Sequence, residues 1–188
     1  MELDGLQTEF LGRNLMYFDV IDSTQKKVKL IKQPQNGTIV IADRQIEAVG
    51  THDRKWYTGS GKNIAMSFVL LPNCNIQKID NITIKIAECL VKVLKKITEL
   101  NLQIKEPNDI YYNGKKLGGI LTEIFCKGEN VSKLYIGIGI NVNQEMFPGN
   151  LNEIATSLKK EIGKEFDRKI IIEEFLKEFE KVYLKAVK

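Results

Sequence analysis

Three segments of the chain combine glycines with polar side chains that could do chemistry. The first, residues 50–56, places Arg54 and Lys55 beside Gly50 and carries the single tryptophan, Trp56. The two cations could meet a phosphate, and the indole could stack on a base or act as a lid. A solvated loop with Trp56 packed in the core would explain the same residues, and we favour that interpretation when this segment is considered by itself.

The second segment joins Pro107-Asn108-Asp109 to residues 114–120. Lys116 stands two residues before the pair Gly118-Gly119, where a ligand could lie directly against the backbone. A lysine there could neutralise a developing charge on an oxyanion or a phosphate. A hairpin with a solvent-facing lysine pair and a bulge is an equally good interpretation.

The third segment is residues 137–143. Gly137 and Gly139 interrupt an otherwise apolar strand, which costs stability and indicates close approach of a ligand or of neighbouring backbone. Asn141, near the end of this strand, could bind a ring or a ribose hydroxyl, or it could start the following turn.

Several common kinds of site are excluded by the sequence. A phosphate-binding loop ending at Gly61-Lys62 would need Gly at position 56 and Ser or Thr at 63, where the chain has Trp56 and Asn63. The only histidine, His52, has no second imidazole to complete a triad or a metal site. Three scattered cysteines without a CxxC pair indicate neither disulfides nor zinc, and we expect no metal site built by the protein.

The elements that must position these segments are those of one α+β domain over residues 1–188. Alternating or apolar segments predict strands at 15–21, 38–42, 64–70, 102–105, 110–112, 117–125 and 134–142. Helical spacing predicts helices at 25–31, 79–100, 152–160 and 169–186. Hairpins with few intervening helices predict a mixed, mostly antiparallel sheet with helices packed on one side. The irregular stretch 43–63 is long enough to be functional.

Composition limits the class of protein. The chain has 188 residues, 43% hydrophobic and 28% charged, as in ordinary globular domains. No apolar stretch approaches the roughly 18 residues of a membrane span, and the acidic N-terminus without an apolar core predicts a cytoplasmic protein rather than a secreted one. The net charge of +4 is spread along the chain, which is weak support for nucleic-acid binding.

In this order, the three segments resemble the catalytic domain of the biotin protein ligases, a fold related to the class II synthetases. Asp22-Ser23-Thr24-Gln25 resembles the family's Asp-Ser-Thr-Asn, and Gln45 with Arg54-Lys55-Trp56 resembles its glutamine and Arg-Lys-Trp. Pro107-Asn108-Asp109, residues 116–121 and residues 137–143 match the remaining motifs at the family's spacing. The likeness runs from about Met16 to Glu180, and five motifs in register are highly specific.

The resemblance implies an ATP-dependent, magnesium-assisted reaction in two steps. Biotin attacks the α-phosphate of ATP to give biotinyl-5′-AMP, and a lysine of a biotin carboxyl carrier protein then takes the acyl group. The residues implied are Lys116 and Arg54 in catalysis; Ser23, Thr24, Gln25, Gln45, Gly50, Thr51, Trp56, Lys116, Gly118 and Gly119 around biotin; and Arg54, Trp56, Asn108, Lys116 and Asn141 on the nucleotide.

The chain also departs from the family pattern. Residues 48–53, Ala-Val-Gly-Thr-His-Asp, replace Gly-Arg-Gly-Arg-Arg-Gly, and Glu106 replaces a common tryptophan. A non-catalytic biotin-binding or sensing relative is therefore the alternative. Lipoate or octanoate transfer is a third hypothesis, although we find no Arg-Arg-x-x-Gly-Gly-Gly segment. Since the sequence indicates no helix-turn-helix before Met16, we expect no DNA binding. We also expect that the small β domain of the family is missing after the last helix. Edge strands could pair two chains in a homodimer.

Overall fold

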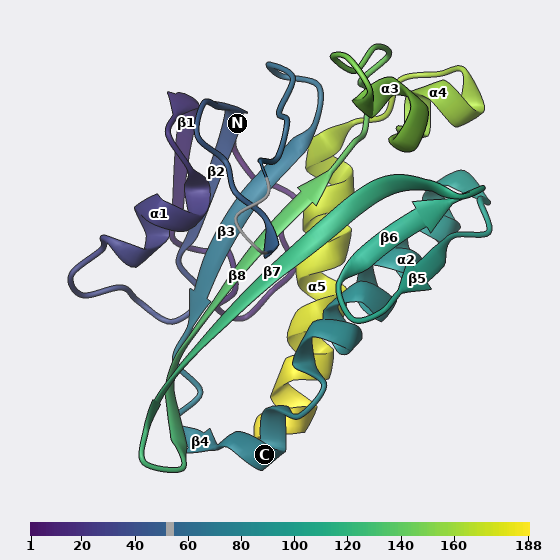
Figure 1. Ribbon diagram of the computed structural model, residues 1–188. Helices are drawn as coiled ribbons and strands as arrows, with labels where there is room; N and C mark the ends of the chain where they lie inside the picture. The colour runs from purple at the N-terminus through teal and green to yellow at the C-terminus, as the bar shows by residue number, and fades with distance from the viewer. Residues whose placement is uncertain (52–54) are drawn as a thin grey trace.

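The computed structural model describes residues 1–51 and 55–188, which build one mixed sheet of eight strands (Figure 1). In spatial order the strands are β1 (Leu15–Ile21), β2 (Ile39–Gln45), β3 (Ile64–Leu70), β8 (Asn130–Ile140), β7 (Lys115–Lys127), β6 (Asp109–Tyr112) and β5 (Gln103–Lys105), with the short β4 (Cys74–Asn75) also paired to β8. Among the strands that the structure describes, only β1 and β2 pair in parallel, and the other pairs are antiparallel. The expected mixed, mostly antiparallel sheet is confirmed.

Two long helices, α2 (Ile82–Thr98) and α5 (Arg168–Val187), cover one face of the sheet, as Figure 1 shows. Apolar side chains recur on α2 at three- and four-residue spacing, and those of Ile86, Leu90 and Leu94 are buried in the main core. Phe179 of α5 stacks on Phe175 of the same helix at 5.7 Å between ring centroids and meets Phe68 of β3 at 5.8 Å. The main core therefore lies between this face and the two helices.

The short helix α1 (Thr24–Lys29) lies against the opposite face, where Val28 packs with Val40, Val69 and Tyr135. It forms the crossover that a parallel β1–β2 pair requires. Ser23 caps it by accepting a hydrogen bond from the backbone N–H of Lys26. The expectation of helices on one side thus holds for α2 and α5, whereas α1 leaves the other face only partly covered.

The remaining differences from the sequence prediction are local. The helix expected at 152–160 is divided into α3 (Leu151–Ile154) and α4 (Leu158–Ile162), because Ser157 is extended and caps α4. Strand β7 extends beyond both predicted bounds, whereas β8 begins before its predicted start and ends two residues before its predicted end; the two form a long hairpin. A single turn of 3-10 helix covers Ile76–Ile79. Among the described residues, no helix is both long and apolar enough to cross a membrane.

Candidate active site

A strip of small side chains on the α1 face of the sheet makes room for a pocket. Strand pairing places Gly139 beside both Ala65 and Gly119, and Gly137 beside Ser67. All three glycines line a cavity, which we call the glycine pocket, together with the start of α1, the end of β2 and the loop that follows β2. Of the four glycines predicted to permit close approach, Gly119, Gly137 and Gly139 therefore line this cavity.

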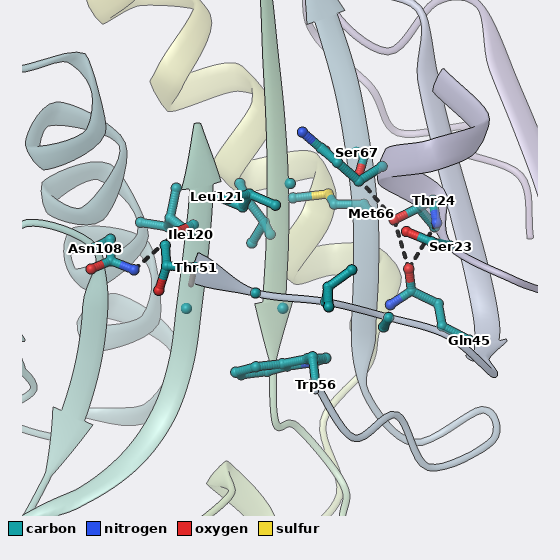
Figure 2. A pocket seen from close by; sticks show the side chains of 18 of the residues that line it. Ser23, Thr24, Gln45, Thr51, Trp56, Met66, Ser67, Asn108, Ile120 and Leu121 are labelled. Atoms are coloured by element: carbon teal, nitrogen blue, oxygen red, sulfur yellow. Dashed lines mark hydrogen bonds between the residues drawn. The ribbon is translucent and has the colours of Figure 1, made fainter. Parts of the chain in front are cut away.

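A hydrogen-bonded network of polar side chains closes one end of the glycine pocket (Figure 2). The Oε1 atom of Gln45 accepts from the backbone N–H of Thr24 at 2.8 Å and from its hydroxyl at 3.0 Å. The Thr24 hydroxyl is also 2.8 Å from that of Ser67. Because Thr24 has a single hydroxyl proton, which goes to Gln45, Ser67 must donate to Thr24. The proton of the capping Ser23 hydroxyl and an amide N–H of Gln45 are donors left for a ligand.

Trp56 lies across the glycine pocket, and Asn108 lies at the end of the pocket opposite the Thr24 network (Figure 2). Its backbone N–H donates to Ala48 at 2.9 Å, which ties the two described sides of the loop together. The indole rests on Gly139, where an added methyl group would stand 2.5 Å from Cε2 of the ring. Its Nε1 is buried and has no hydrogen-bond partner among residues 1–51 and 55–188.

A β-bulge aims Lys116 at the same space. The pairing of β6 with β7 slips at Leu117, so Ile110 faces Gly118 whereas Tyr111 faces Lys116. The extra residue leaves Leu117 in the core and turns Lys116 to the face that Gly119 occupies. The Lys116 ammonium lies 2.7 Å from Oδ1 of Asp109 and 5.5 Å from the centre of the Trp56 ring.

A second cavity, the adjoining pocket, continues from the glycine pocket on the other side of Trp56. Gly50, Thr51, Trp56, Asp109 and Lys116 line both cavities. The walls that belong to the adjoining pocket alone are Lys55, Tyr57, Tyr111, Asn141, Phe147, Leu151, Ile154 and Ala155. The arrangement offers a polar-ended slot, a larger apolar space beside it, and one lysine at their junction.

Most of the residues proposed from the sequence come together here. Ser23, Thr24, Gln25, Gln45, Gly50, Thr51, Trp56, Asn108, Lys116 and Gly119 line the glycine pocket, and Asn141 lines the adjoining one. Gly118 does not line either, because alternation along β7 turns it to the core face, where an added methyl group would meet Ile140 at 2.5 Å. Arg54 lies outside the described residues.

Ser67 and Glu123 were not predicted from the sequence as residues of this region, and Asp109 was predicted only as part of a motif, without a role. Ser67 joins the Thr24 network, Asp109 pairs with Lys116, and Glu123 of β7 holds Gln25 with a hydrogen bond of 2.7 Å. Ser67 could have been found, because it is the one polar residue in the seven-residue strand β3. Glu123 carried no comparable signal, since polar residues are ordinary on a half-exposed strand.

Comparison with known proteins identifies relatives that match most of this chain. The bifunctional ligase/repressor BirA of Bacillus subtilis is 40% identical over 183 residues, which cover 95% of this chain and 56% of that protein. A biotin–(acetyl-CoA carboxylase) ligase of Paracoccus denitrificans is 31% identical over 161 residues, covering 82% of this chain and 65% of that one. The chain thus spans little more than half of its first curated relative.

Solved structures agree with the sequence comparison. The biotin protein ligase from Aquifex aeolicus, in complex with biotin and ATP, matches with a TM-score of 0.80 and 33% identity over 92% of this chain and 71% of that one. The model of the biotin/lipoate A/B protein ligase family matches residues 17–141. Since this match takes in both pockets' central strands and more than half of the sequence, the chain belongs to the biotin/lipoate A/B protein ligase family.

Proposed function

We propose that this chain catalyses ATP-dependent biotin ligation, forming biotinyl-5′-AMP and passing the biotinyl group to a lysine of a biotin carboxyl carrier domain. The observation that carries the proposal is the position of Lys116 at the junction of two cavities that share one wall. A carboxylate reaching out of the glycine pocket and an α-phosphate entering from the adjoining pocket would meet at its ammonium group.

The first step joins these two groups. A carboxylate oxygen of biotin attacks the α-phosphorus, the bond from that phosphorus to the bridging oxygen breaks, and pyrophosphate leaves. Negative charge accumulates on the phosphoryl oxygens during this exchange, and a fixed cation within reach lowers the barrier. Asp109 keeps the Lys116 ammonium in place through its 2.7 Å ion pair, so no reorganisation is needed when the charge develops.

The second step needs the mixed anhydride to survive until the carrier arrives. The ε-amine of the acceptor lysine attacks the acyl carbon, AMP leaves with the former carboxylate oxygen, and the amine gives up a proton. Water would compete for the same carbon, so exclusion of water protects the intermediate. Trp56 is placed for this role because it covers the glycine pocket and lines the adjoining one.

The polar residues divide between the two substrates. Ser23, Thr24 and Gln45 suit a ureido head group, which carries both donors and an acceptor. Asn141 suits the nucleotide: hydrogen bonds from its N–H to Leu117 and from Leu158 to its carbonyl hold its backbone at the end of β8. Asn108 donates to the carbonyl of Ile120 at 3.2 Å and would act from the far end of the glycine pocket. Arg54 completes the proposed catalytic pair.

Magnesium belongs to the proposal as a companion of ATP. Within residues 1–51 and 55–188 no three His, Cys, Asp or Glu side chains gather as a metal site. Mg²⁺ bound to a nucleotide usually takes most of its ligands from phosphates and water, with one or two carboxylates from the protein. The ion would supply further neutralisation of the phosphates.

We also propose that two chains could form a homodimer by pairing through an edge strand of the sheet, β1 or β5.

Pyrophosphate release tests the function directly. The full chain is incubated with ATP, Mg²⁺ and either biotin, lipoate or octanoate, and pyrophosphate is followed with and without a biotin carboxyl carrier domain. We expect release with biotin alone and biotinylated carrier when the domain is present. Release with lipoate or octanoate instead would make the chain a transferase for those acids. Biotin binding without pyrophosphate release would make it a sensing relative.

A further inference from the structure

Only one end of the Gln25 side-chain amide is hydrogen-bonded: the nitrogen, Nε2, has a partner, whereas the oxygen, Oε1, has none among the described residues. The residue is 8% exposed and lines the glycine pocket. Its Nε2 donates to Oε2 of Glu123 at 2.7 Å. The other carboxylate oxygen of Glu123 accepts from Lys29 at 2.8 Å.

The partner of the amide fixes its orientation. An ionised carboxylate can only accept hydrogen bonds, so the end of the amide that faces Glu123 must be the nitrogen. Burial raises the pKa of Glu123, but the hydrogen bonds from Lys29 and Gln25 outweigh it and the net pKa is lowered, so the carboxylate is ionised at neutral pH. The amide oxygen of Gln25 therefore points away from Glu123.

That oxygen lies over the floor of the glycine pocket. A methyl group added to Gly137 would stand 2.8 Å from it. It is buried and has no donor among the described residues, 1–51 and 55–188. The hydroxyl protons of Thr24 and Ser67 are already used, since Thr24 donates to Gln45 and Ser67 to Thr24, and the Ser23 hydroxyl makes no hydrogen bond to this oxygen. Burying an acceptor without a donor costs free energy. A ligand bound in the pocket could supply the missing donor.

We propose that Gln25 is a specificity-determining residue: Glu123 holds its amide so that Oε1 accepts a hydrogen bond from a ring N–H of the ligand. This inference rests on the proposed function and deepens it. A ureido ring, as in biotin, has two N–H groups to offer, whereas the dithiolane ring of lipoate has none. Bound lipoate would leave the buried oxygen unpaired, and sites built to receive a hydrogen bond discriminate strongly against ligands that lack the donor.

Replacing Gln25 by methionine tests the acceptor, because the side chain keeps its length and loses the oxygen. Biotin and lipoate binding to the full chain are measured by calorimetry. We expect the Kd for biotin to rise about tenfold to a hundredfold, as loss of one buried hydrogen bond predicts, while lipoate binds no more weakly. General damage to the pocket would weaken both ligands together. A biotin Kd within about threefold of the unmodified chain's would overturn the inference.

Glu123 is tested as a positioning residue by exchanging the pair. Gln25→Glu alone sets two carboxylates against each other, and Glu123→Gln alone allows the Gln25 amide to turn over; both should weaken biotin binding. The double variant Gln25→Glu/Glu123→Gln restores one donor facing one acceptor and still presents an oxygen to the pocket. Recovery of biotin affinity in the double variant supports the proposal. Losses that simply add, with no recovery, count against it.

The unmodified chain separates this inference from the proposed function. If it fails to bind biotin, the proposed function fails and the inference falls with it. If it binds biotin and releases pyrophosphate while Gln25→Met binds biotin equally well, the function stands and only the role of Gln25 is refuted. Lys29→Met is the matched control: it removes the other partner of Glu123 without changing the Gln25 pair, so it should weaken biotin binding less than Gln25→Met does.

Discussion

The ammonium group of Lys116 and the carboxylate of Asp109 form an ion pair of 2.7 Å across the β6–β7 hairpin. Both side chains line both pockets, so the pair marks the point where the two cavities meet. The β-bulge at Leu117 is the cause of this geometry, because without the extra residue strict alternation would turn Lys116 toward the opposite face. A local defect in strand pairing thus creates the charged centre of the site.

Lys116→Ala should slow pyrophosphate release by about a hundredfold or more, since loss of one preorganised electrostatic contact typically costs this much. The side chain is outside the core, so the melting temperature should change little. The rate is measured at saturating biotin and ATP. Lys115→Ala, one residue earlier in β7 and absent from both pockets, is the control and should retain its rate. A near-normal rate in Lys116→Ala would remove this lysine from the mechanism.

Gly139→Ala should displace Trp56, because the added methyl group would stand 2.5 Å from Cε2 of the indole. Trp56 is the only tryptophan, so the tryptophan fluorescence of the protein reports the environment of this side chain. We expect a red shift and weaker binding of biotin. Gly119→Ala provides a graded comparison, since its methyl group would lie 3.3 Å from the same ring and should have a smaller effect. Unchanged emission in Gly139→Ala would show that the ring does not rest on the strand.

The sequence predicted the strand and helix content well because local signals determine it: alternation in residues 64–70 and helical spacing in 82–98. It could not predict that β1 and β2 run parallel, because a six-residue α1 is a very short crossover. The sequence also did not predict the bulge at Leu117. It therefore could not predict that Gly119, and not Gly118, lines the pocket. Glu123 illustrates the general limit: its role depends on a partner 98 residues away in the sequence.

Stability should depend on pH through Glu123. Burial raises its pKa, but hydrogen bonds from Lys29 and Gln25 lower it more, so the folded-state pKa lies below the usual 4.5. A lowered folded-state pKa contributes stability that is fully present above the usual value and is lost as pH falls through the folded-state value. The free energies of unfolding of the native chain and of Glu123→Gln, measured by urea denaturation, should therefore differ at neutral pH and converge as the pH falls below the usual value of 4.5. A difference that stays constant over this range would contradict the assignment.

Glu180 of α5 should contribute strongly to stability and not to catalysis. It is 5% exposed, and its carboxylate accepts hydrogen bonds from the backbone N–H groups of Glu9, Phe10 and Leu11 at 2.7, 3.0 and 2.8 Å. Glu180→Ala would leave these donors without their acceptor, at a cost of about 3 kcal/mol, since each buried unpaired group costs roughly 1–3 kcal/mol and the exposed end of the segment can turn to water.

Chemical denaturation measures that cost, with Glu178→Ala as the control on the same helix. Glu178 pairs with the exposed Lys92, and such surface pairs contribute about 1 kcal/mol or less. Because neither Glu180 nor the segment that it holds lines either pocket, pyrophosphate release by Glu180→Ala should be near normal at a temperature where the variant is folded. Equal losses of stability in the two variants would mean that the three backbone hydrogen bonds to Glu180 do not hold the N-terminal segment in place.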